Sequence, residues 1–105
     1  MGLDCAYDYM HNHIVGFEWD AFKASANARK HGVQFAEAMS VFTDEYAITL
    51  TDDESSRDEQ RFVTMGMGMK ARVLVVVYCF RGKSIRIISA RPATKQECQR
   101  YEQQL

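Results

Sequence analysis

The chain has 105 residues, with 13 Lys and Arg against 14 Asp and Glu, so its formal net charge at pH 7 is −1. A chain of this length forms one domain and can hold a core without disulfide staples. No apolar stretch approaches the roughly 20 residues of a membrane-spanning helix, and the first residues lack the pattern of a secretory signal. Cys5, Cys79 and Cys98 lack the spacing of a metal site, which favours reduced thiols and a cytoplasmic protein.

Residues 1–16 show no clear period, and we expect them to form a poorly ordered extension ahead of a single domain at residues 17–105. His11 and His13 lie in this extension. Two histidines without further ligands nearby are typical of a protein surface, so we predict no metal site there.

The domain is expected to open with a strand and a helix. Residues 17–20 predict a short strand that ends at Asp20, whose carboxylate can accept hydrogen bonds from the first free amides of a helix. This helix is expected to run to about Lys30 and to stop at Gly32. Its spacing places a polar, basic stripe on one face, formed by Lys23, Asn27, Lys30 and His31. The residues then available to face inward are Phe22, Ala26 and Val33.

A second helix and a strand follow. Residues 34–42 predict a helix whose apolar stripe packs on a sheet, with the stripe formed by Phe35, Ala38, Met39 and Phe42. Residues 46–51 alternate like a strand with one buried face, and residues 52–59 predict an acidic loop. This loop lacks the glycine and the terminal glutamate of an EF-hand, so we interpret it as a solvated loop without a metal.

The stretch from Arg61 to Gln96 predicts a β-meander. Residues 73–80 form a continuous β-branched and aromatic run, which predicts a central strand buried on both faces. The turn at residues 81–83 contains Gly82 and leads into a strand at residues 84–89. Residues 61–65 enter the same sheet, followed by a looser hairpin with Gly66, Gly68 and Lys70.

A final helix should begin after Pro92, because Thr94 and Glu97 have the spacing of a capping box. Its apolar edge would be formed by Cys98, Tyr101 and Leu105. The order of elements predicts the α+β class, with two N-terminal helices packed on a curved, mainly antiparallel β-sheet and a C-terminal helix.

The predicted meander is strongly basic. It contains no acidic residue and eight basic ones, which are Arg61, Lys70, Arg72, Arg81, Lys83, Arg86, Arg91 and Lys95. Arginine binds phosphate through paired hydrogen bonds, and phosphate contacts supply much of the affinity of nucleic-acid binders, so we expect RNA as the ligand. Arg86 and Arg91 have opposite parity along one strand and can converge only if it ends or bulges near Ser89. The alternative is that these charges only protect sheet edges from aggregation.

RNA cleavage needs no metal if the 2′-hydroxyl of the substrate attacks the adjacent phosphate. The protein must then place positive charge around the phosphorane and transfer protons. The candidates on the first helix are His31, Lys23 and Lys30. Their spacing does not show that they meet Arg86, and a histidine near a helix C-terminus often only interacts with the helix dipole.

The order of several short motifs is similar to that of a known family. These motifs are Phe17-Glu18-Trp19-Asp20, then Lys23, Asn27, Lys30-His31-Gly32-Val33 and Phe35-Ala36-Glu37-Ala38, then Arg61-Phe62 and residues 85–91, Ile-Arg-Ile-Ile-Ser-Ala-Arg. Together with a closing basic helix they resemble the BrnT toxins of bacterial type II toxin-antitoxin systems, over about Phe17 to Tyr101. Two features depart from the family pattern, the extension at residues 1–16 and Ala21 where a proline would begin the first helix.

The resemblance implies a RelE-like fold and a metal-independent endoribonuclease, without a cofactor, that arrests growth by cleaving RNA. It also implies a BrnA-like antitoxin with a ribbon-helix-helix domain, so that DNA would be contacted only through the toxin-antitoxin complex, which would repress its own operon. A homodimer and a heterotetramer with the antitoxin both stay open.

The resemblance also suggests which residues form the site. Arg86 and Arg91 are expected to contact the phosphate or the transition state, and His31 to transfer a proton. The expected RNA and phosphate contacts are Lys23, Lys30, Arg61 and Arg72. An alternative function is a non-catalytic module that binds RNA or an acidic protein through the basic sheet face.

Overall fold

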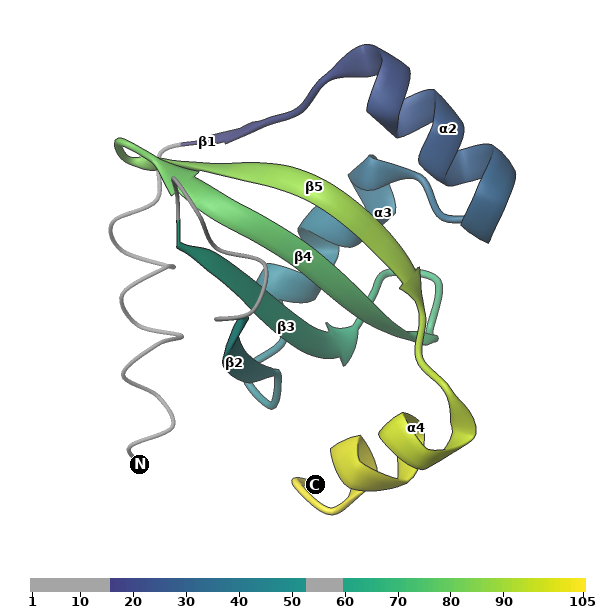
Figure 1. Ribbon diagram of the computed structural model, residues 1–105. Coiled ribbons are helices and arrows are strands. Elements are labelled where there is room, and N and C mark those ends of the chain that lie inside the picture. Colours follow the sequence, from purple (N-terminus) through teal and green to yellow (C-terminus); the bar gives the residue numbers. More distant parts are fainter. Residues whose placement is uncertain (1–15, 53–59) are drawn as a thin grey trace.

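The computed structural model describes residues 16–52 and 60–105. Its elements, in chain order, are β1 (Gly16–Glu18), α2 (Ala21–His31), α3 (Phe35–Ser40), the 3-10 turn η1 (Val41–Thr43), β2 (Ile48–Asp52), β3 (Arg61–Met67), β4 (Val73–Arg81), β5 (Ser84–Pro92) and α4 (Lys95–Glu102) (Figure 1). Residues 1–15 of the predicted extension and 53–59 of the predicted acidic loop lie outside the described residues, whereas Gly16 begins β1 and Asp52 ends β2.

The five strands form one mixed sheet in the order β1-β5-β4-β3-β2. Strands β2 to β5 pair antiparallel with their neighbours, whereas β1 pairs parallel with β5 over three residues. The α+β class, the meander and the central position of β4 are therefore confirmed. The short strand at the start of the domain is also present, and its parallel pairing next to β5 was not predicted.

Local signals in the sequence set the ends of several elements. The carboxylate of Asp20 accepts hydrogen bonds from the amides of Phe22 at 2.8 Å and Lys23 at 3.1 Å, which confirms the predicted N-cap of α2. Gly82 turns the β4-β5 hairpin with φ of 63°, a left-handed conformation that favours glycine. At the start of α4, Thr94 and Glu97 form the predicted capping box.

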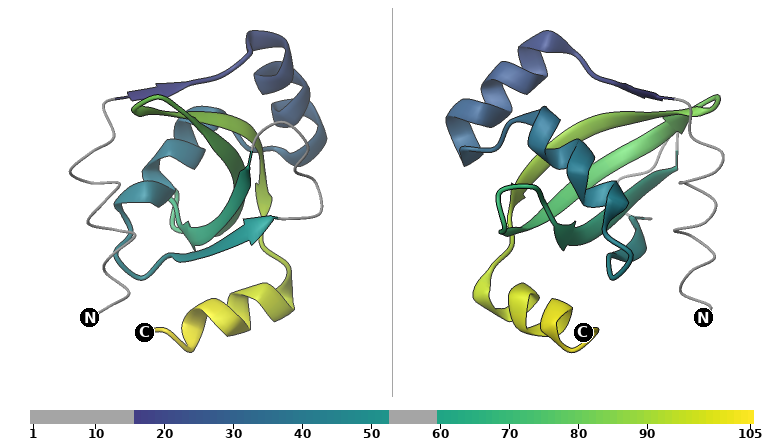
Figure 2. Two further views of the ribbon diagram at one scale, coloured as in Figure 1. Left: turned by 60° about the vertical axis from the view of Figure 1, so that its left-hand side comes forward. Right: turned by 180° about the vertical axis from the view of Figure 1, so that it is seen from behind.

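The main core lies between the sheet and the helices α2 and α3. Figure 2 shows α3 crossing one face of the sheet, with α2 beside β5. The buried side chains of this core include Phe35 and Ala38 of α3, Phe42 of η1 and Tyr78 of β4. Residues 34–42 thus supply core residues as predicted, although the α-helix ends at Ser40 and a 3-10 turn follows.

The inward face of α2 differs from the prediction. Phe22 is 87% exposed and Ala26 is also exposed, whereas Asn27 of the predicted polar stripe is buried. The Asn27 amide donates to the carbonyls of Ala90 at 2.8 Å and Val33 at 3.0 Å, and its oxygen accepts from the Ala90 amide at 3.1 Å. The reason is the sheet edge, because β1 pairs with β5 only as far as Arg86. At Ala90 no strand of the described residues pairs with this edge of β5, and the Asn27 side chain makes the hydrogen bonds that such a strand would make.

A smaller cluster lies on the opposite face of the sheet, under α4. Tyr101 is buried there against Met65 and Val75, and its hydroxyl donates to Asp44 at 2.5 Å. Burial in this cluster raises the pKa of Tyr101, and the bond to the Asp44 carboxylate raises it further. Leu105, predicted to belong to the apolar edge of α4, is 69% exposed because the helix ends at Glu102.

Candidate functional site

A β-bulge places Arg86 and Arg91 on the same face of the sheet. Val77 of β4 pairs with Ser89, and the next residue, Tyr78, pairs with Ile87, so Ile88 is an extra residue in β5. Before the bulge the odd-numbered Ile85 and Ile87 enter the main core, and after it the even-numbered Ala90 does. The two arginines therefore both face away from α2 and α3. Of the two possibilities for the strand near Ser89, an end or a bulge, the structure shows the bulge.

The two arginines are nevertheless well separated. Arg86 pairs with Cys79 and Arg91 with Val75, four residues away along β4, which corresponds to about 13 Å. They share a face of the sheet but do not share one small pocket.

Arg91 is bound by a carboxylate from α4. Its two terminal nitrogens donate to the two oxygens of Glu97 at 2.8 and 2.9 Å. The same carboxylate accepts the backbone amide of Thr94 at 2.8 Å. The bond to Arg91 is the main reason that the pKa of Glu97 falls to about 2, and the pKa of Arg91 is raised in return. Arg91 thus links the end of β5 to the start of α4.

Arg72 is bound in a similar way. Its guanidinium donates to both oxygens of Glu37, at 2.7 and 2.8 Å, and to the carbonyl of Gly32 at 2.8 Å. The Glu37 side chain is 1% exposed, and the hydrogen bonds from Arg72 lower its pKa despite the opposing effect of burial. This contact ties the β3-β4 turn to the loop between α2 and α3. A buried carboxylate depends on such a partner, so Arg72 has a structural role.

Arg86, the other arginine of the predicted catalytic pair, is half-buried and has no carboxylate partner among the described residues. It makes no hydrogen bond and no ion pair with residues 16–52 or 60–105. Cys79 of β4 pairs with it on one side and Glu18 of β1 on the other. Because Phe62 and Tyr78 are partners, Arg61 lies opposite Cys79, two strands from Arg86 and about 10 Å away between Cα atoms. Arg61 and Arg86 face the same side and can approach one ligand from two directions.

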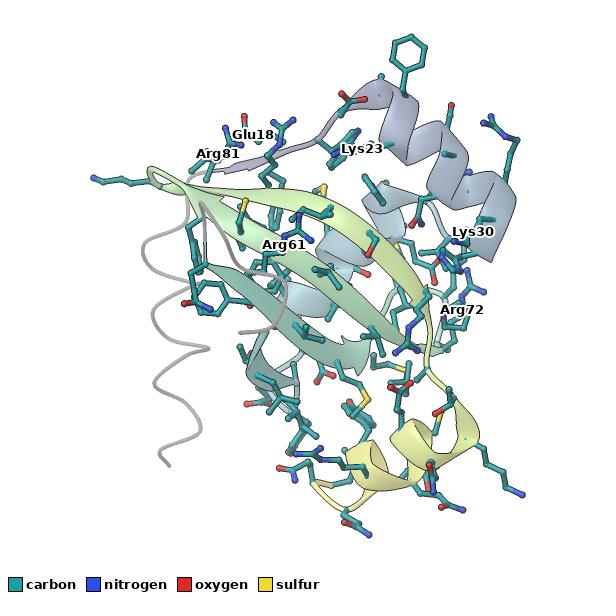
Figure 3. All side chains as sticks on the ribbon, in the orientation of Figure 1. Glu18, Lys23, Lys30, Arg61, Arg72 and Arg81 are labelled. Carbon is teal, nitrogen blue, oxygen red and sulfur yellow. The ribbon has the colours of Figure 1, made fainter. Side chains whose placement is uncertain are left out.

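The remaining predicted site residues, together with Glu18 and Arg81, divide between the two ends of the sheet (Figure 3). Glu18, Arg61 and Arg81 lie toward the β4-β5 hairpin, with Lys23 above them at the start of α2, whereas Lys30 and Arg72 lie toward the opposite end. His31 ends α2 and directly precedes Gly32, whose carbonyl binds Arg72. The structure therefore groups His31 with Lys30 and Arg72, and does not bring it to Arg86.

Two features of the site were missed by sequence reasoning. The first is Glu18. Strand alternation places it on the face opposite the core-facing Phe17, but its position beside Arg86 depends on a parallel pairing that was not predicted. The second is the pairing of Arg72 and Arg91 with carboxylates. For the pair of Arg91 and Glu97, the sequence signal was the Thr94-Glu97 capping box, which places Glu97 close to the end of β5.

Within residues 16–52 and 60–105, no cluster of three or more His, Cys, Asp or Glu side chains could hold a metal ion. In the same part of the chain no helix has the length and apolar character needed to cross a bilayer.

The molecule is thus a small α+β domain with a basic sheet face opposite its main core. The sequence matches the family described as "Ribonuclease toxin, BrnT, of type II toxin-antitoxin system" over residues 19–97. The chain therefore belongs to the BrnT family of ribonuclease toxins. As toxins of type II systems act together with an antitoxin, membership implies an antitoxin partner and an RNA substrate.

The fold also resembles a solved member of this family. The crystal structure of the Brucella abortus ribonuclease toxin, BrnT, superposes with a TM-score of 0.60 at 22% sequence identity. The match covers 76% of this chain and 97% of the Brucella chain. At this identity the likeness supports the fold. No curated protein matches the sequence.

Proposed function

We propose that this chain is a metal-independent endoribonuclease that arrests growth by cleaving RNA until a BrnA-like ribbon-helix-helix antitoxin binds it. In this proposal the antitoxin carries the DNA-binding domain, and the toxin reaches DNA only within the complex. Family membership supports the ribonuclease class, and the arrangement of the arginines supports the location of the site.

The observation that carries the proposal is Arg86, which has no hydrogen-bond or ion-pair partner among the described residues. A half-buried guanidinium is costly unless something stabilises its charge, and neighbouring arginines repel it. Arg72 and Arg91 each have a carboxylate for this purpose, whereas Arg86 has none among the described residues. An anionic ligand would fill this role. A backbone phosphate fits, since it can accept paired hydrogen bonds from Arg86 and a second contact from Arg61 across β4.

The proposed chemistry uses the substrate's own nucleophile. The 2′-oxygen attacks the adjacent phosphorus, the bond to the 5′-oxygen breaks, and the products carry a 2′,3′-cyclic phosphate and a 5′-hydroxyl. Arg86 and Arg61 stabilise the negative charge that builds on the phosphorane oxygens. Lys23, at the near end of α2, is placed to bind a neighbouring phosphate. Lys30 and His31 lie farther along β5 and are assigned to flanking RNA instead of the reacting phosphate.

RNA cleavage by purified protein in excess EDTA tests this proposal. The R86A variant should lose about 10² to 10³-fold in cleavage rate, the usual effect of removing one charge-stabilising donor. R100A is the matched control, because Arg100 is an exposed arginine of α4 on another part of the surface, and should cleave normally. A folded R86A variant with full activity would contradict the site. Salt-sensitive binding of RNA that is never cleaved would favour the non-catalytic alternative.

A further inference from the structure

Glu18 is the acidic residue that the pairing of the strands places beside Arg86. The parallel pairing of β1 with β5 places Glu18 directly beside Arg86, with Cα atoms about 4.8 Å apart. Phe17, the preceding residue, packs on Phe42 in the main core, so Glu18 faces the opposite side together with Arg86. Glu18 is exposed, and no hydrogen bond or ion pair joins it to the described residues.

We propose that Glu18 is the general base of RNA cleavage, the group that accepts the proton of the attacking 2′-hydroxyl. This inference rests on the proposed function and adds the proton-transfer group that it lacks. A carboxylate can act in this way only within hydrogen-bond reach of the hydroxyl. A phosphate held by Arg86 places its own ribose next to that arginine, and therefore next to Glu18.

The proposed step is balanced in atoms and charge. The Glu18 carboxylate takes the 2′-hydroxyl proton as the new bond from the 2′-oxygen to phosphorus forms. The bond from phosphorus to the 5′-oxygen breaks, and the 5′-oxygen takes a proton from water. The hydroxide that remains then receives the proton from Glu18, which regenerates the carboxylate for the next cycle.

Several arginines lie on the same side of the sheet as Glu18. The register of the strands places Arg86 of β5, Arg81 of β4 and Arg61 of β3 on this side of the sheet. All three carry positive charge, and no carboxylate of residues 16–50 or 60–105 forms an ion pair with Arg86. His31, the proton-transfer residue implied by the family resemblance, lies at the other end of β5. Glu18 immediately precedes the region that matches the BrnT family, so the inference depends on this chain's own geometry.

The test compares E18Q with E102Q, which makes the same chemical change at an exposed glutamate at the end of α4. Single-turnover cleavage of a short RNA is measured from acidic to neutral pH, and RNA affinity is measured separately. We expect E18Q to cleave about 10² to 10⁴-fold more slowly, the usual contribution of a general base, while it binds RNA at least as tightly. The wild-type rate should fall on acidification, and this fall should disappear in E18Q. E18D should restore part of the rate together with the pH dependence.

Each outcome distinguishes the two proposals. If the wild type cleaves RNA and E18Q retains both its rate and its pH profile, the role of Glu18 is wrong and the proposed function stands. If E18Q loses RNA affinity and cleavage in parallel, Glu18 contributes to binding and the base assignment is also wrong. If the wild type leaves RNA intact in EDTA, or leaves 3′-hydroxyl ends, the proposed function fails and the inference fails with it.

Discussion

Asn27 shows how one polar side chain can replace a strand. It is buried, and its three hydrogen bonds satisfy both backbone groups of Ala90 and the carbonyl of Val33. Two of these bonds hold α2 against the open part of the β5 edge. The third binds the carbonyl of Val33 just after the helix, next to the helix end that carries Lys30 and His31. Asn27 therefore orients the helix that carries three of the predicted site residues, without being exposed to a ligand.

Replacement of Asn27 by alanine should destabilise the fold by about 3 kcal/mol, because an unsatisfied buried backbone group costs about 1 to 3 kcal/mol. Denaturant unfolding measures this free energy. S25A is the control, since Ser25 is exposed on the same helix, and it should stay within about 0.5 kcal/mol of the wild type. Equal stability of N27A and S25A would show that water replaces the amide at no cost.

The element with the most specific attachment is α4. Glu97 lies at the centre, since it completes the capping box of the helix and binds Arg91 of β5. At the other end of the helix, Tyr101 is bound to Asp44, whose carboxylate also accepts the amide of Met67 at 2.8 Å. The helix is thus held at both ends by hydrogen bonds to carboxylates. In this position the helix holds Glu97 against Arg91, so the Arg91 guanidinium is already bound by a carboxylate.

The attachment of α4 should depend on pH. The pKa of Glu97 is lowered to about 2 in the folded protein, so its ionised form stabilises the fold fully above its ordinary value of 4.5. This contribution is lost as the pH falls from there toward 2. Unfolding free energies measured from neutral pH to about pH 3 should therefore fall less steeply for E97Q than for the wild type.

E102Q serves as the control for this experiment, because Glu102 is exposed at the end of the same helix and should leave the slope unchanged. The Glu37 carboxylate, whose pKa is also lowered, remains in both proteins and contributes equally to their acid sensitivity. Parallel curves for E97Q and the wild type would contradict the role of the Arg91 contact.

The elements were largely predictable where the signal is local. The Asp20 cap, the Gly82 turn, the apolar run of β4 and the Thr94-Glu97 capping box depend on neighbouring residues, and each is present in the structure. The parallel position of β1 depends on tertiary packing and was not predictable from a three-residue strand. The inward face of α2 was predicted wrongly, because hydrophobic periodicity assigns Asn27 to the surface and ignores its use at a sheet edge.

The candidate site was predictable in composition but not in pairing. The meander is free of acids along the sequence, yet Glu37 binds Arg72 from 35 residues away and Glu97 binds Arg91 from the following helix. The basic residues that are close in the sequence thus differ in their availability to a ligand. The parity of Arg86 and Arg91 indicated that β5 must end or bulge near Ser89 if both arginines share a face, and the structure has a bulge there.

For the whole molecule, the positive groups available to a ligand are spread along β5. Arg86 lies near the start of β5. Lys23 lies toward the same end of the sheet and Lys30 toward the other (Figure 3). A single RNA strand that follows β5 would meet both groups in turn. In this arrangement one end performs the chemistry, and the other contributes affinity through a flanking phosphate.

K30A should therefore weaken RNA binding and reduce the slope of log K against log salt by about 0.7, the value for one phosphate contact in a single strand. The cleavage rate of fully bound RNA should be unchanged. R100A, which changes an exposed arginine in the last turn of α4, removes one positive charge from another part of the surface and should leave the slope as it is. If K30A lowers the single-turnover cleavage rate at saturating protein, Lys30 acts at the reacting phosphate and the assignment to flanking RNA is wrong.

Because Ile88 is an extra residue in β5, a deletion or insertion in this strand would change the direction of its side chains. Deletion of that one residue would shift the phase of the strand, so that the guanidinium groups at positions 86 and 91 would point to opposite sides of the sheet. One of them would then be directed into the apolar layer beneath the helices, which cannot accommodate it. The chain length of β5 therefore encodes the orientation of its charges, and a single-residue gap here would be more disruptive than most substitutions.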